Sequence, residues 1–107
     1  MHLPPAIQAY FEADRRNDCE AVVACFAPDA TVHDEGRSHS GHYAIGTWWE
    51  QAKARYRHTA EPIEAQDHDG ITRVRARVAG EFPGSPAVLT FAFSLAADKI
   101  SSLEIGA

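Results

Sequence analysis

The stretch FAPDATVHDEG, residues 26–36, decides the fold because the chain changes there from helical to β structure. Before it, apolar residues recur at helical spacing. Within it, the segment APDA at 27–30 interrupts that spacing, and the β-branched run that begins at Thr31 predicts a short strand over 31–34. We expect a loop rich in Gly, Ser and His to follow over 35–41. Asp34 is therefore predicted at the end of a strand, beside a loop.

Helical spacing predicts three helices around this stretch. Pro5 opens the first, since proline is favoured at the first helical position, and Asp18 is a capping residue for the second. Gly41 leads into the third, in which apolar residues recur every three or four positions. The predicted ranges are 6–16, 19–26 and 42–56.

After residue 57 the pattern becomes that of β structure. Four strands are predicted, at about 58–67, 71–82, 87–96 and 99–105. In the second, Arg73, Arg75 and Arg77 share one face, which we expect to be the outer one. There we expect them to be solvated, or paired across a dimer interface with Glu61, or with Glu64 if the register differs. The fold class is therefore α+β: a single domain, residues 1–107, with three N-terminal helices on one face of a curved, mainly antiparallel sheet.

Composition narrows the range of partners. The chain has 107 residues and a net charge of −5, with no long basic run, which argues against nucleic-acid binding. No apolar run approaches the roughly 18 residues that span a bilayer, and the N-terminus does not resemble a signal peptide, so no membrane partner is expected. Cys19 and Cys25 fall on different faces of a helix, which argues against a disulfide and favours a cytoplasmic location.

The segment VHDEGRSHSGH, residues 32–42, holds three histidines and two carboxylates and raises the question of a metal site. A metal needs several ligands that converge. His33 and Asp34 are neighbours on a strand and point to opposite faces, and no strong spacing of histidines occurs. No metal is predicted, and without a phosphate-binding loop no cofactor is expected either. A single acid at a pocket is the favoured interpretation.

Three segments make the chain resemble the nuclear transport factor 2-like superfamily, in its SnoaL-like branch. They are FAPDATVHDEG at 26–36, SGHYAIGTWW at 40–49 and FPGSPAVLTFAFSLAADKISSLEI at 82–105. The resemblance covers nearly the whole chain. It implies a cone, in which a strongly bent sheet and three helices enclose a pocket open at one end, and a homodimer formed through the sheet. The same fold carries enzymes, binding domains and transport adaptors.

Among these proteins, the bacterial ketosteroid isomerases are the nearest in mechanism. Their general base lies in a segment F-x-x-D-A-T-V-x-D, which Asp34 matches, and their oxyanion-hole tyrosine is matched by Tyr10. Two features depart from the pattern. The protonated aspartate of the oxyanion hole is matched by Phe91, and a supporting tyrosine is matched by Trp49, whose N–H can donate a hydrogen bond but cannot accept one.

The resemblance places further residues at the pocket. His42 is a candidate second acid–base group, and Tyr43 is expected near the pocket entrance. A wall of aromatic rings suits a flat, hydrophobic ligand, although each ring could equally be plain core. The residues expected in this wall are Trp48, Trp49, Phe91, Phe93 and Phe26.

Three functions remain open. The first is an isomerase or cyclase in which Asp34 is the general base and Tyr10 or Trp49 donates a hydrogen bond to the developing enolate oxygen. The second is a non-catalytic domain that binds a small apolar molecule. The third is a dimerisation module whose cone is filled by its own aromatic side chains. In the alternatives to catalysis, Asp34 caps the loop near Gly36 and Tyr10 is a core residue.

Overall fold

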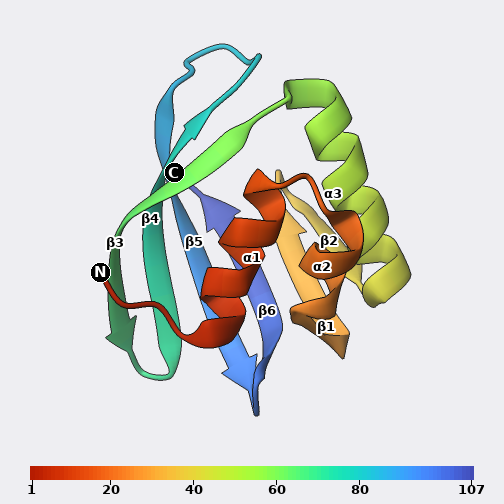
Figure 1. The fold of residues 1–107 in the computed structure, drawn as a ribbon, viewed down its shortest axis with the longest axis vertical. Helices are drawn as coiled ribbons and strands as arrows, with labels where there is room; N and C mark the ends of the chain where they lie inside the picture. The colour runs from red at the N-terminus through yellow and green to blue at the C-terminus, as the bar shows by residue number, and fades with distance from the viewer.

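The computed structural model describes residues 1–107 and contains three helices and one six-stranded sheet (Figure 1). The α+β prediction is therefore confirmed. The elements are α1 (Pro5–Arg15), α2 (Cys19–Ala24), β1 (Phe26–Asp34), β2 (Arg37–Ser40), α3 (His42–Tyr56), β3 (Thr59–His68), β4 (Ile71–Ala79), β5 (Ala87–Ala96) and β6 (Lys99–Gly106). None of the helices is both long and apolar enough to cross a bilayer.

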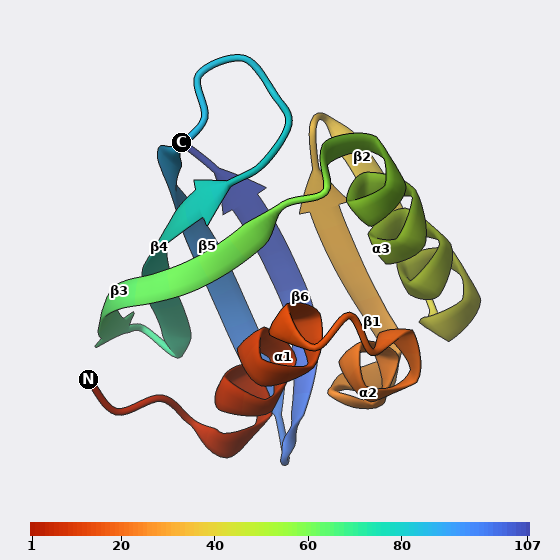
Figure 2. The ribbon, with the colours of Figure 1, turned by 45° about the horizontal axis from the view of Figure 1, so that its top comes forward.

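The sheet runs in the order β2-β1-β6-β5-β4-β3. All neighbouring strands are antiparallel except β1 and β6, which are parallel. The helices pack on one face, with α1 against β3 and β6 and α3 against β1 and β2. In Figure 2, β3 bends across the end of the sheet so that α1 lies inside the curve. The space between α1, α3 and the bent sheet is where a site can form.

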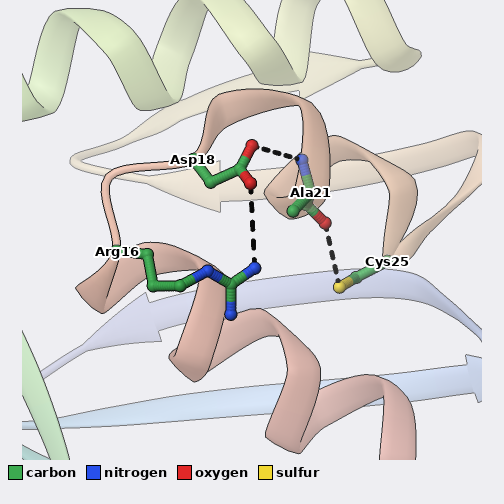
Figure 3. A network of polar contacts seen from close by, with 4 residues as sticks. All are labelled: Arg16, Asp18, Ala21 and Cys25. Carbon is green, nitrogen blue, oxygen red and sulfur yellow. Dashed lines mark hydrogen bonds and ion pairs between the residues drawn. The ribbon is translucent and has the colours of Figure 1, made fainter.

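Helix α1 turns an apolar face to the sheet, and its buried residues include Ile7, Tyr10 and Phe11. Asp14, one turn after Tyr10, is also buried. A tight connection then leads into α2, where the Asp18 side chain caps the helix by accepting a hydrogen bond from the backbone N–H of Ala21 at 3.1 Å. Figure 3 shows this cap with Arg16 beside it, 3.7 Å from the Asp18 carboxylate.

The two cysteines are free, as predicted from their spacing. The thiol of Cys25 donates to the carbonyl of Ala21 at 3.3 Å within its own turn (Figure 3). Cys19 lies against Gly46 of α3, where an added Cβ would be 3.4 Å from the Val23 side chain and 3.8 Å from the Cys19 sulfur. Small residues here let α2 and α3 approach closely.

The alternation predicted for β4 is observed. Val74, Ala76 and Val78 are buried in the core, and the three arginines that alternate with them, Arg73, Arg75 and Arg77, are exposed. Arg75 pairs with Glu64 across β3 and β4 at 2.6 Å, within one chain. The outer face of the sheet is therefore charged at this edge, as expected for a face that no helix covers.

The stretch that decides the fold differs from prediction at both ends. α2 ends at Ala24, and β1 already begins at Phe26. The register of β1 against β6 shifts between Phe26 and Thr31, so Pro28 sits in an irregular part of the strand rather than in a helix end. The predicted loop at 35–41 contains β2, which forms a hairpin with β1 around Glu35 and Gly36, both at positive φ. β2 is a polar edge strand, so it lacks the apolar alternation that reveals inner strands.

Candidate functional site

A cavity of about 440 Å³ lies among α1, α3 and the sheet, a volume within the usual range for small-molecule sites. Eleven of the sixteen residues that line it are hydrophobic, so the walls suit an apolar ligand. Tyr10, Trp48, Trp49 and Phe91 line it, as the sequence predicted. The aromatic side chains do not fill the cone, because these rings surround an open space.

Asp34, at the end of β1, lines this cavity. The indole N–H of Trp48 donates to its Oδ2 at 3.0 Å and fixes the carboxylate. Burial raises the pKa of Asp34, and the neighbouring Glu35 charge raises it further, whereas the hydrogen bond from Trp48 acts in the opposite direction. Burial is the largest of these effects. The result is a held carboxylate with a higher proton affinity than an ordinary aspartate.

Tyr10 lies on α1 with only 3% of its surface exposed. Its ring packs edge-on against Phe11 and Phe26, with ring centroids 5.2 and 5.9 Å away. Burial, followed by the charges of Asp14 and Asp34, raises the pKa of Tyr10 well above its ordinary value. The hydroxyl therefore stays protonated. Because no residue of the chain takes its hydrogen bond, it is available as a donor to a ligand in the cavity.

Trp49 holds a second carboxylate. Its indole N–H donates to Asp14 Oδ1 at 2.9 Å, and Lys53 Nζ lies 3.1 Å from the same oxygen. The Lys53 ammonium also donates to the backbone carbonyl of His58 at 2.5 Å and lies 5.6 Å from the centre of the Trp49 ring. Asp14 and His58 both line the cavity. The sequence reasoning assigned neither a role, although a carboxylate on the apolar stripe of α1, four residues after Tyr10, was a usable signal.

A third polar contact joins two parts of the cavity wall. The Tyr56 hydroxyl, at the end of α3, donates to Glu35 Oε1 in the β1–β2 turn at 2.7 Å. This hydrogen bond is the main reason that the pKa of Tyr56 is raised. Both residues line the cavity, so the contact connects the hairpin turn to the helix next to the site.

Four residues expected at the pocket do not line it. The His42 ring is hydrogen-bonded to the backbone carbonyl of Phe26 at 2.8 Å, and the side chain of Phe26 lies in the core with 1% exposure. Phe93 is fully buried in the core behind Tyr10. Tyr43 is 89% exposed. His42 and Tyr43 lie in the first turn of α3, whereas the cavity begins near Trp48, more than one turn later.

The histidines of the 32–42 segment do not converge. His33 is hydrogen-bonded to Ser38 across the β1–β2 hairpin at 2.9 Å, and the His39 ring lies 6.2 Å from the ring of Trp48. No group of three or more His, Cys, Asp or Glu side chains is arranged to hold a metal ion. The chemistry that the described residues offer at this site is hydrogen bonding and proton transfer.

Comparison with known proteins identifies a matching family and several structures with the same fold. The SnoaL-like domain family matches residues 7–103. A crystal structure of a proposed polyketide cyclase from Sinorhizobium meliloti is 46% identical, with a TM-score of 0.93, and the match covers 96% of this chain and 94% of that one. Among curated proteins, none matches this chain.

Two more distant structures share the fold. One is a protein with a ketosteroid isomerase-like fold from Catenulispora acidiphila, in complex with trimethylamine, at 18% identity and a TM-score of 0.85, covering 99% of this chain and 87% of that one. The other is a proposed polyketide cyclase from Xanthomonas campestris, at 22% identity and a TM-score of 0.77, covering 94% and 86%. At these identities the likeness concerns the fold alone.

Proposed function

Since the chain belongs to the SnoaL-like family, we propose that it is an acid–base enzyme of the isomerase or cyclase type. Its substrate is a flat, largely apolar molecule with a C–H bond next to a carbonyl group. The observation that carries this proposal is Asp34: a carboxylate with a raised pKa, held by Trp48 on the wall of an apolar cavity. The naming of the Sinorhizobium relative as a proposed polyketide cyclase supports the same class of reaction.

In this mechanism Asp34 takes the proton from carbon and becomes a neutral carboxylic acid, leaving an enolate. The raised pKa of Asp34 suits the task because a general base works best when its pKa lies nearer the working pH. The enolate carbon then either receives the proton back at another position, which is isomerisation, or attacks a second carbonyl group, which closes a ring. In the second case the new alkoxide takes the proton from Asp34.

Tyr10 is the donor proposed for the enolate oxygen, because this residue lines the cavity and its hydroxyl remains protonated and has no partner in the chain. Trp49, the other donor considered from the sequence, is occupied, since its indole N–H already donates to Asp14. Phe91, which the resemblance matches to the second acid of the ketosteroid isomerases, supplies no hydrogen bond. Loss of one oxyanion donor typically costs about 10²–10³-fold in rate. We therefore expect slow enolisation.

The missing second oxyanion donor favours one competing function, a domain that binds an apolar molecule without turning it over. An open apolar cavity with a phenyl group at Phe91 serves binding as well as it serves catalysis. The two functions differ in whether Asp34 exchanges a proton with the bound molecule.

Deuterium exchange separates them. 2-Tetralone, a flat bicyclic ketone with acidic C–H bonds, is incubated in D₂O with wild-type protein, and loss of its α-proton signals is followed by NMR. We expect exchange above the buffer rate, reduced about 10²–10⁴-fold by Asp34→Asn, the usual contribution of a general base. Tyr10→Phe should reduce it about 10²–10³-fold. Asp29→Asn, at an exposed position of the same strand, is the matched control. Exchange that is unchanged in Asp34→Asn would refute the enzymatic proposal.

A further inference from the structure

Two buried polar atoms of this chain have no hydrogen-bond partner. They are Asp14 Oδ2 and His58 Nδ1, the only side-chain oxygen or nitrogen atoms that are themselves fully buried and unpaired; the Tyr10 hydroxyl, which also lacks a partner, is not among them. Both residues line the same cavity. Unpaired buried polar atoms are rare because each loses its hydrogen bonds to water without replacement, at a higher cost when the group is charged. Because both residues belong to one cavity wall, the geometry points to a bound ligand as the source of the missing hydrogen-bond partner.

The fold fixes both residues around one cation. Lys53 Nζ lies 3.1 Å from Asp14 Oδ1 and donates to the backbone carbonyl of His58 at 2.5 Å. With Trp49 also donating to Asp14 Oδ1, that oxygen is fully engaged, and the carboxylate cannot rotate without losing two contacts. Oδ2 is thus the atom of this carboxylate that is left without a partner. Asp14 is 3% exposed, so bulk water does not take the place of a partner.

The two unpaired atoms, Asp14 Oδ2 and His58 Nδ1, have different hydrogen-bonding roles. Asp14 Oδ2, held next to a lysine, is an acceptor. Burial lowers the pKa of His58, and the Lys53 charge lowers it further, so the ring is neutral near pH 7. A neutral imidazole protonated on Nδ1 donates from that atom. With His58 in this tautomer, the wall offers one acceptor and one donor.

A hydroxyl group matches this pair. Its O–H donates to Asp14 Oδ2 while its oxygen accepts from His58 Nδ1. A ketone oxygen would leave Asp14 unsatisfied, a carboxylate would be repelled by it, and an ether can accept but cannot donate. The neighbouring wall is apolar, with Ala60, Val78 and Trp49, so the hydroxyl would sit at the end of a hydrophobic body.

We propose that Asp14 and His58 form a hydroxyl-binding subsite, which selects ring-shaped apolar molecules that carry a phenol or alcohol. This subsite belongs to the cavity of the proposed function and rests on it, since it describes the substrate as a hydroxylated one. It is distinct from Asp34, which acts on carbon, and it requires no proton transfer. The two proposals can therefore fail separately.

The test compares two probes that differ only in the donor, 2-naphthol and 2-methoxynaphthalene, by isothermal titration calorimetry. We expect wild-type protein to bind 2-naphthol at least about tenfold more tightly, the effect of one charge-assisted hydrogen bond. His58→Phe should reduce this preference to within about twofold. The variant retains the backbone carbonyl that Lys53 uses and the ring contact with Tyr56, whose centroid is 6.4 Å away, so the fold is preserved.

Asp14→Asn should also remove the preference, because an amide N–H₂ then replaces the acceptor that the hydroxyl needs. Asp34→Asn is the control: it should lose deuterium exchange of 2-tetralone and keep the preference for 2-naphthol. In ¹⁵N NMR of the histidine rings, 2-naphthol should shift the Nδ1 signal of His58, and the ether should leave it in place.

Four outcomes overturn the proposal. First, the two probes bind equally well or neither binds. Second, the preference for 2-naphthol survives in His58→Phe. Third and fourth, the preference disappears in Asp34→Asn or in Tyr10→Phe, which would place the hydroxyl group of 2-naphthol at Asp34 or at Tyr10. Unchanged exchange in Asp34→Asn, with the preference intact, would instead refute the enzymatic proposal and leave the subsite standing.

Discussion

Trp48 and Trp49 are neighbours in sequence, yet their indole nitrogens donate to carboxylates on two different elements. Trp48 donates to Asp34 on β1 at 3.0 Å, and Trp49 donates to Asp14 on α1 at 2.9 Å. Successive residues of a helix point about 100° apart, so one turn of α3 reaches two walls of the cavity. The two acids thereby receive different environments: Asp34 has a neutral donor only, whereas Asp14 also has Lys53.

Replacement of Asp34 should make the protein more stable near neutral pH. Because the folded-state pKa of Asp34 is raised, the folded protein binds the proton more tightly than the unfolded chain does, and stability falls as pH rises through that pKa. Asp34→Asn removes this pH-dependent loss of stability, because asparagine has no proton to release. We expect its free energy of unfolding, relative to wild type, to increase between pH 3 and pH 7 by about 1.4 kcal/mol for each unit of raised pKa. Urea denaturation at the two pH values measures it, with Asp29→Asn as control. An equal difference at both would contradict the raised pKa.

Trp48→Phe should raise the pKa of Asp34 further. The indole hydrogen bond stabilises the ionised carboxylate, and it is lost while the burial that raises the pKa largely remains. Titration of the Asp34 carboxyl carbon by ¹³C NMR gives the value directly. Trp49→Phe is the matched control, since it removes an indole that bonds to Asp14 instead. If Trp48→Phe left the pKa unchanged or lowered it, the hydrogen bond would not be acting on the charge of Asp34.

Lys53→Met should destabilise the protein strongly. Both partners of the Lys53–Asp14 pair are buried, with side chains 11% and 3% exposed, so the variant leaves a buried carboxylate without its cation. Breaking such a pair typically costs about 3–5 kcal/mol. The comparison is Arg75→Met, which breaks the exposed pair with Glu64 and should cost about 0–1 kcal/mol. Similar losses in the two variants, measured by chemical denaturation, would show that Asp14 does not depend on Lys53.

Gly80→Ala should distort the wall that carries Tyr56 and His58. An added Cβ at Gly80 would lie 2.6 Å from the Tyr56 carbonyl oxygen and 2.8 Å from His58 Cα, and both are backbone atoms that cannot swing away. We expect a loss of about 1–3 kcal/mol, typical of overpacking, and weaker binding of 2-naphthol. Gly106→Ala, where an added Cβ meets nothing within 4 Å, is the control. If Gly80→Ala were as stable as wild type, the close backbone contact of Gly80 with Tyr56 and His58 would not be a constraint on the fold.

The parts of the fold that the sequence predicted best are those with long, regular patterns. α3 and β5 begin and end at the predicted residues, because fifteen residues of helical spacing and ten of alternating apolar residues leave little ambiguity. β2 was missed, since a polar edge strand needs no apolar face. The start of β1 was misplaced because Pro28 reads as a break, whereas the strand accommodates it at an irregular register.

For the site, the resemblance pointed to Asp34 and Tyr10, which both line the cavity, but neither it nor the sequence pattern pointed to Asp14 and His58. His58 acquires its place only because the chain leaves α3 through the left-handed Arg57 and passes close to Gly80, a long-range contact that no local pattern contains. For His42 the reverse is true: the sequence suggested a role at the pocket, and the structure places the residue elsewhere. It looked chemically suitable beside Asp34, yet its ring is engaged by the Phe26 carbonyl, because the first turn of α3 lies beside β1.

The two tryptophans of the chain both stand in the cavity wall, each hydrogen-bonded to a carboxylate. All indole fluorescence of this protein therefore originates at the cavity. Filling the cavity, or protonating Asp34, changes the surroundings of an emitting ring directly. The native chain thus carries its own optical reporter of occupancy, and compound libraries can be screened against it without any label.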